Sequence, residues 1–129
     1  MPPSAEPIYV VDDDLSVRES VTACLGSFAF DARPFASAEA FLDAGFDPNI
    51  GCLVLDISMP GMNGEQLQEY LRATERAIPI VFITACTEAA VCGRVLERGA
   101  VACLAKPFQE DELLNAVNAA IRSREQRTP

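Results

Sequence analysis

The sequence contains no histidine among its 129 residues. Without an imidazole, the chain has neither Ser-His-Asp nor Cys-His catalysis, and most zinc sites are excluded as well. Long apolar runs are also missing, since none approaches the roughly 18 residues that a membrane span needs. The first residues, "MPPSAEP", have neither the basic residues nor the apolar core of a signal peptide. We therefore expect a cytoplasmic protein that does not contact the membrane.

Basic residues are few, with 10 Lys and Arg against 19 Asp and Glu, so the net charge is −9. This charge repels nucleic-acid phosphates, and we expect no direct nucleic-acid binding by this chain. With 50% hydrophobic and 22% charged residues, the composition is that of a globular protein. The length predicts a single domain over residues 1–129. Its core should cover about 7–122, and residues 123–129 form a polar tail or the start of a linker.

The cysteines are odd in number and have no CxxC spacing, which argues against a disulfide framework or a zinc site. The five are Cys24, Cys52, Cys86, Cys92 and Cys103. Four of them lie in apolar segments, and in a reducing compartment we interpret them as small hydrophobic residues. A thiol-switch role for Cys86, Cys92 or Cys103 stays open as an alternative hypothesis.

Short apolar runs recur along the chain and alternate with segments of helical spacing. The runs cover residues 8–11, 28–35, 52–55, 80–83 and 101–104. In the first intervening segment, Val17, Val21, Leu25 and Phe28 keep to one helical face. Strands that are apolar at nearly every position and joined by helices imply a parallel sheet covered on both faces. The pattern therefore predicts an α/β, doubly wound domain of five strands and five helices.

In such sheets the ligand site forms beyond the carboxyl ends of the strands. Polar residues follow four of the five predicted strands there: Asp12, Asp13 and Asp14 after the first, Asp56 after the third, Thr84 after the fourth and Lys106 after the fifth. Asp14 is interpreted as a turn or helix-capping residue only. The other five should converge on one site.

That constellation suits the binding and transfer of a phosphoryl group. Carboxylates in one crevice repel each other and need either raised pKa values or a bound cation, for which Mg²⁺ is the natural choice. Asp12 and Asp13 are then half of a metal site. The Lys106 ammonium and the Thr84 hydroxyl complement phosphoryl oxygens. The remaining carboxylate, Asp56, becomes the candidate phosphoryl acceptor.

Four motifs in order, "VVDDD", "LVLDISMPGMNG", "VFITA" and "LAKPF", closely resemble the receiver domain of bacterial two-component response regulators. The flanking "YVVDDDLSVRES" and "FASAEAFL" look most like the FixJ-type subfamily. The resemblance covers the chain from about Ile8 to Ile121. It implies a flavodoxin-like (βα)5 fold with a five-stranded sheet of order 2-1-3-4-5.

The resemblance also implies a function and a metal. Asp56 would accept a phosphoryl group from the phosphohistidine of a sensor histidine kinase, which supplies the imidazole that this chain lacks. Asp12, Asp13 and Asp56, with the backbone carbonyl of Ser58, would hold Mg²⁺ or Mn²⁺. Such a domain catalyses its own phosphorylation and slow dephosphorylation without being a conventional turnover enzyme.

The switch that the resemblance implies differs at one position. Thr84 matches the hydroxyl that bonds the phosphoryl group, and Lys106 matches the lysine that contacts it, with Lys106-Pro107 expected to be cis. Three residues before this lysine the family usually has Tyr or Phe, whereas this chain has Cys103, which we interpret as core filler. The expected output is a changed partner surface, or a homodimer, on the face of the fourth helix, fifth strand and fifth helix.

Two other functions remain as alternatives. Cys103 at the switch position permits a receiver-like docking module that binds partners without cycling phosphate. The stretch "DDDLS" also fits a haloacid-dehalogenase-like phosphatase, in which Asp12 would be the nucleophile beside Asp14 and Ser16.

Overall fold

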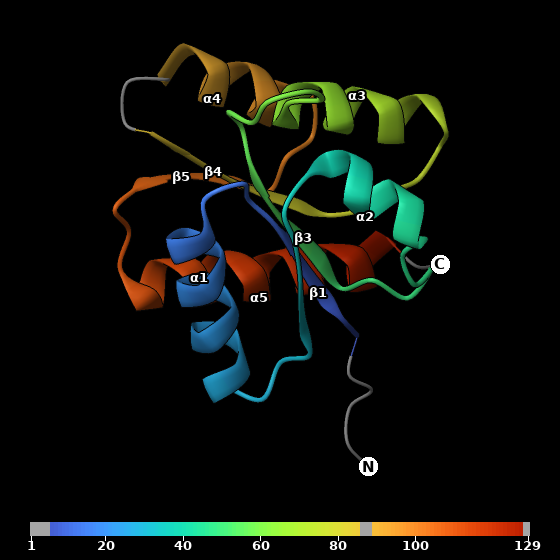
Figure 1. Ribbon diagram of the computed structural model, residues 1–129. Helices are drawn as coiled ribbons and strands as arrows, with labels where there is room; N and C mark the ends of the chain where they lie inside the picture. The colour runs from blue at the N-terminus through green and yellow to red at the C-terminus, as the bar shows by residue number, and fades with distance from the viewer. Residues whose placement is uncertain (1–5, 86–88, 128–129) are drawn as a thin grey trace.

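The computed structural model describes residues 6–85 and 89–127, and in these the strands and helices alternate (Figure 1). The elements are β1 Ile8–Val11, α1 Leu15–Ser27, β2 Ala32–Phe35, α2 Ala38–Ala44, β3 Cys52–Asp56, α3 Gly64–Ala73, β4 Ile80–Ala85, α4 Ala89–Glu97, β5 Ala102–Lys106 and α5 Glu110–Arg127. No helix in these two ranges is long and apolar enough to cross a bilayer.

The five strands form one parallel sheet in the order β2-β1-β3-β4-β5. This order confirms the predicted flavodoxin-like, doubly wound fold. β1 lies between β2 and β3, so the chain reverses its direction of winding beside β1, and that is where such sheets form their sites.

The helices cover both faces of the sheet: α2, α3 and α4 lie on one side, and α1 and α5 on the other (Figure 1). Phe41, Leu67 and Phe82 belong to the core beneath the first group. Leu25 and Val117 belong to the core beneath the second. Because both faces are covered, β1 and β3 are buried at every residue, which explains their continuous apolar character.

The second strand is shorter than predicted. Residues 28–31 do not extend the strand, because Phe28 follows the last turn of α1 and its N–H bonds the Leu25 carbonyl at 3.1 Å. Ala29 then turns the chain with a φ of 69°. Phe28 is 51% exposed, so the aromatic residue that suggested a strand is a surface residue.

Cys92 on α4 and Cys103 on β5 form a disulfide. The interpretation of both residues as reduced, small hydrophobic side chains was therefore wrong, and Cys103 is not simply core filler. Sequence spacing gave no signal for the pair, because the two cysteines lie on a helix and on a separate strand. Cys24 and Cys52 are free, as expected, and Cys86 lies outside the described residues.

Candidate functional site

The carboxyl ends of β1, β3, β4 and β5 bring most of the predicted site residues together. Asp12 follows β1 and Asp56 ends β3, and both side chains are buried. Asp13 is exposed beside them, and one carboxylate oxygen from each of the three residues lies within 4.8 Å of the others. Lys106 ends β5 and points at the same cluster, with Nζ 3.2 Å from Asp12 Oδ2 and 3.4 Å from Asp56 Oδ1. The predicted convergence of these four residues is confirmed.

Thr84 and Ser58 lie on the elements that frame this cluster. Thr84 is buried in β4, one residue beyond Ile83, which pairs with Asp56 in the sheet register. Its hydroxyl donates to the Ala85 carbonyl at 3.2 Å. Ser58 is exposed in the loop after β3, and its N–H donates to Asp56 Oδ1 at 3.4 Å. The geometry is compatible with both assignments, and their roles remain predictions.

Asp14 does not join the acidic cluster. Its carboxylate caps α1 by accepting hydrogen bonds from the N–H groups of Ser16 at 2.9 Å and Val17 at 3.3 Å. The interpretation of Asp14 as a capping residue is confirmed. A phosphatase that needs Asp14 as a second catalytic acid is correspondingly disfavoured, since this carboxylate is already occupied.

Burial of the site changes the acidity of its groups. Burial, and after it the nearby Asp12 charge, raise the pKa of Asp56 to about 7 against the opposing effect of Lys106. For Lys106, burial acts to lower the pKa, but the charges of Asp12 and Asp56 outweigh it, so the pKa of Lys106 is raised overall. Two buried carboxylates therefore share one ammonium, and the site has an excess of negative charge.

The residues fit a hard divalent cation. The donor set is entirely oxygen, which suits Mg²⁺. Asp12 Oδ2 is buried and has no aligned hydrogen bond among the described residues, although Lys106 Nζ lies 3.2 Å away. A bound cation stabilises a buried carboxylate oxygen that has no aligned hydrogen bond. Burial and the Asp12 charge raise the pKa of Asp56, and a cation bound beside Asp56 would oppose that rise.

Three supporting residues were not identified from the sequence as parts of the site. Arg18 donates from Nη1 to the Asp12 carbonyl at 2.8 Å and so holds the loop after β1. Glu39 accepts from the Met62 N–H at 2.8 Å and anchors the loop after β3. Gly64 lies so close to β3 that an added Cβ would be 2.5 Å from the Asp56 carbonyl oxygen. No sequence signal indicated this role of Gly64, because close approach of two backbones depends on the fold.

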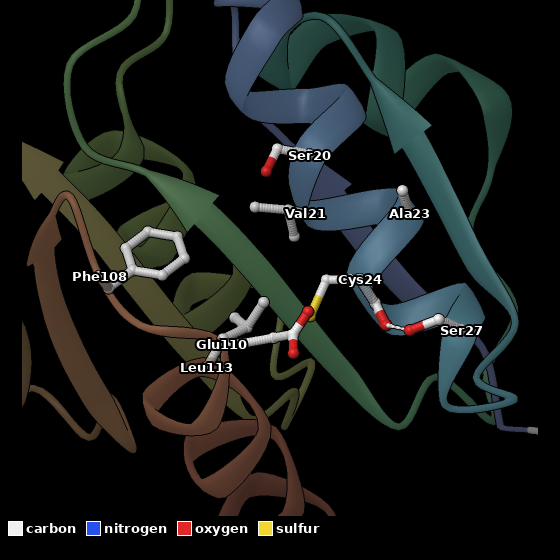
Figure 2. A pocket seen from close by; sticks show the side chains of 8 residues that line it. All are labelled: Ser20, Val21, Ala23, Cys24, Ser27, Phe108, Glu110 and Leu113. Carbon is white, nitrogen blue, oxygen red and sulfur yellow. Dashed lines mark hydrogen bonds between the residues drawn. The ribbon is translucent and has the colours of Figure 1, made fainter.

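An apolar groove adjoins the site on the α1 side. Val17, Val21 and Phe108 line it next to Lys106, and its volume is about 480 Å³. A second pocket of about 440 Å³ continues between α1 and the start of α5 (Figure 2). There Cys24 and Glu110 point toward each other, and burial together with the Glu110 charge raises the pKa of the Cys24 thiol. The rim of the site is thus apolar on this side.

A doubly wound sheet with paired carboxylates, an acceptor-like aspartate and a lysine at its strand ends defines a receiver-type signalling domain. The chain belongs to the response regulator receiver domain family, whose sequence pattern it matches over residues 8–118. The resemblance noted from the motifs is therefore confirmed, and no finding favours the docking-module or phosphatase alternatives.

Similar proteins support the FixJ-type assignment. The transcriptional regulatory protein TdiR of Thauera aromatica is 42% identical over 118 residues, covering 92% of this chain and 52% of that protein. FixJ of Bradyrhizobium diazoefficiens is 37% identical, covering 92% and 58%. Among solved structures, the response regulator StyR is 43% identical with a TM-score of 0.87, covering 95% of this chain and 63% of that one. The chain thus spans about half the length of these curated relatives.

Proposed function

We propose that this chain is the phosphoacceptor of a two-component system and that Asp56 takes a phosphoryl group from a sensor-kinase phosphohistidine. An Asp56 carboxylate oxygen attacks phosphorus, the bond to the donor imidazole nitrogen breaks, and an acyl phosphate forms on Asp56. The position of Asp56 supports this role, because it ends β3 between a second carboxylate and an ammonium. Slow hydrolysis of the acyl phosphate returns the chain to its starting state.

Asp12, Asp13 and Asp56, with the Ser58 carbonyl, are proposed to hold Mg²⁺ or Mn²⁺. The cation supplies charge neutralisation for the phosphoryl oxygens when it is bound. Asp12 accepts the N–H of Asp14 through Oδ1 at 2.9 Å, which leaves Oδ2 for the cation. Receiver domains of this family generally bind Mg²⁺, and the cluster fits that property.

Lys106 and Thr84 are proposed to contact the phosphoryl group once it is on Asp56. The Lys106 ammonium pairs with Asp12 and Asp56, so it can follow the added negative charge with a small displacement. The Thr84 hydroxyl, which bonds the Ala85 carbonyl, would exchange this partner for a phosphoryl oxygen. That exchange shifts the end of β4 and with it the surface of α4, β5 and α5, which we propose as the partner or homodimer face.

The kinase is proposed to dock at the apolar groove beside Lys106. A phosphohistidine donor has to reach Asp56 from the rim of the site, and Val17, Val21 and Phe108 offer apolar surface there. We further propose a cytoplasmic location and a single domain over residues 1–129, with its core at about 7–122. No direct contact with nucleic acid is expected from this chain, because its net charge is −9.

Phosphorylation by acetyl phosphate tests the proposal, which rests chiefly on the position of Asp56 beside Asp12 and Lys106. Wild type incubated with acetyl phosphate and Mg²⁺ should gain one phosphoryl group by intact mass spectrometry. Asp56→Asn should lose the label completely, and Asp12→Asn should label many-fold more slowly. Asp14→Asn is the matched control, since asparagine also caps helices and the label should persist. A label that remains in Asp56→Asn but disappears in Asp12→Asn would instead support the phosphatase.

A further inference from the structure

The Cys92–Cys103 disulfide covalently joins α4 to the edge strand β5. The two Cα atoms are 5.7 Å apart, which is within the usual span of a disulfide. Both residues are only partly buried, so the bond is not sealed inside the core.

The disulfide lies on the side of the sheet where a signal from Asp56 must pass. Cys103 is partly buried and packs against the core cluster beneath α2, α3 and α4, and it pairs with Phe82 in the register of β4 and β5. Thr84 lies two residues beyond Phe82 on β4, and Lys106 lies three residues beyond Cys103 on β5. A displacement of either site residue therefore moves strand ends that are directly continuous with the disulfide.

The opposite side of α4 is held to α3 by noncovalent contacts. Gln68 Nε2 donates to the Val95 carbonyl at 3.1 Å. Glu65 pairs with Arg94 at 2.9 Å and with Arg98 at 3.2 Å, both partly exposed contacts. The two exposed ion pairs exchange easily, whereas the buried Gln68 hydrogen bond and the covalent bond to β5 are more persistent. The disulfide therefore adds a covalent link between α4 and β5 to the packing that already holds α4 through the buried Val95.

We propose that Cys92 and Cys103 form a thiol–disulfide redox site that holds α4 against β5 when oxidised and frees it when reduced. The regulatory consequence rests on the proposed function, because α4 is the helix that phosphorylation of Asp56 is proposed to shift. In the oxidised chain the domain should accept phosphate and fail to rearrange α4. In the reduced chain both steps should occur.

A small-molecule disulfide of the glutathione class is the oxidant. The thiolate of one cysteine attacks a sulfur of this disulfide and releases one thiol, which leaves a mixed disulfide. The second cysteine then attacks the protein sulfur and releases the second thiol. Two protein thiols and one disulfide thus become one protein disulfide and two small thiols, and the reverse exchange reduces the site.

The other described cysteines are poor competitors for this chemistry. Cys52 is buried, and burial raises the pKa of its thiol to about 12. Burial and the Glu110 charge raise the pKa of Cys24, which lowers its thiolate fraction. In the reducing cytoplasm, where disulfides are rare, those that form are usually catalytic or redox-sensing. The proposed cytoplasmic location and the low reactivity of Cys24 and Cys52 both favour a redox role of the Cys92–Cys103 pair over a permanent structural bond.

The redox site is tested first and without phosphorylation. The native protein is equilibrated in buffers of graded reduced and oxidised glutathione, alkylated, and mapped by peptide mass spectrometry. Cys92 and Cys103 should lose alkylation together as the buffer becomes oxidising, and Cys24→Ser should leave this transition unchanged. In Cys92→Ala, Cys103 should form no intramolecular bond and be alkylated throughout or capped by glutathione. Full alkylation of both residues in the oxidising wild-type sample would overturn the proposal.

The coupling to α4 is tested separately, with phosphorylation measured in the same samples. Hydrogen exchange of α4 amides should rise several-fold on addition of acetyl phosphate and Mg²⁺ to reduced wild type and to Cys92→Ala, and stay nearly constant in oxidised wild type. Equal changes in all three, at equal phosphorylation, would refute the coupling. Absence of phosphorylation in every sample would refute the proposed function and leave the alkylation result standing.

Discussion

The acidity of Asp56 results from three neighbouring influences that act at the scale of single residues. Burial at the end of β3 and the charge of Asp12 both favour its protonated form, and the Lys106 ammonium favours the carboxylate. The net effect is a pKa of about 7, against 3.8 for an ordinary aspartate. Near neutral pH the cation-free site therefore holds a proton that the unfolded chain has released.

Because Asp56 holds this proton, we predict that the stability of the Mg²⁺-free chain depends on pH in an unusual way. Between about pH 4 and pH 7 the folded chain binds more protons than the unfolded chain at Asp56, so the free energy of unfolding falls as pH rises and levels off above pH 7. Asp56→Asn should remove this decline and be more stable than wild type by roughly 2 to 4 kcal/mol at pH 8. Urea unfolding in EDTA across this pH range measures the difference.

Asp14→Asn is the control, because the capping carboxylate of Asp14 is exposed and lies outside the cluster. Its stability should follow the wild-type pH dependence. If the free energy of unfolding changes with pH equally in wild type and Asp56→Asn, the Asp56 carboxyl does not hold a proton near neutral pH in the folded chain.

Sequence reasoning placed these residues correctly because the strand ends of a parallel sheet meet at one edge. It predicted that Asp12, Asp13, Asp56 and Lys106 would converge, and the structure confirms this. The sharing of one ammonium by Asp12 and Asp56 was not predictable. It depends on Lys106 Nζ lying 3.2 Å from Asp12 Oδ2 and 3.4 Å from Asp56 Oδ1, and the three residues stand at the ends of three different strands. The Cys103 disulfide was missed because its partner on α4 is set by tertiary packing.

At the scale of elements, α3 begins in direct contact with the end of β3. The N–H of Gly64 donates to the Ile57 carbonyl at 2.9 Å, and Asn63 caps the helix. An added Cβ at Gly64 would lie 2.5 Å from the Asp56 carbonyl oxygen and 2.9 Å from the Ile57 Cα. Backbone atoms cannot move away as a flexible side chain does, so a side chain at this position has to displace the loop that carries the acceptor.

Gly64→Ala is therefore expected to lower the free energy of unfolding by about 1–3 kcal/mol and to slow phosphorylation of Asp56. Gly26→Ala is the matched control, because Gly26 lies within α1 and a Cβ there meets nothing within 4 Å. That variant should gain about 0.5–1 kcal/mol, as alanine does over glycine inside a helix. Urea unfolding and acetyl phosphate labelling of both variants provide the comparison, and unchanged stability and labelling in Gly64→Ala would contradict this close approach.

The element pattern was largely predictable, and its one clear error is informative. The apolar residues throughout β1 and at positions 52–55 of β3 reflect helices on both faces, which the sequence pattern predicts directly. β2 was predicted to begin too early because Phe28 and Phe30 resemble strand residues. The turn at Ala29, with a φ of 69°, depends on where α1 ends and not on hydrophobicity.

At the scale of the whole molecule, the net charge of −9 complicates any measurement of cation binding. Salt of any kind screens the mutual repulsion of the acidic groups and stabilises the folded state to some degree. A divalent cation also screens this repulsion, in addition to any stabilisation that comes from binding at a particular site. Specific binding at Asp12, Asp13 and Asp56 must therefore be separated from screening by comparing solutions of equal ionic strength.

With that comparison, Mg²⁺ at about ten times its dissociation constant should stabilise wild type by about 1.4 kcal/mol more than NaCl of the same ionic strength. Asp12→Asn should lose this excess, because it removes a buried carboxylate from the oxygen donor set, whereas Asp31→Asn should keep it, since Asp31 pairs with Arg33 on the surface away from the cluster. Both variants change the net charge by the same amount, so they respond alike to screening. Thermal unfolding over a Mg²⁺ series provides the measurement. An equal loss in the two variants would mean that Mg²⁺ acts on the charge of the whole molecule and not at this site.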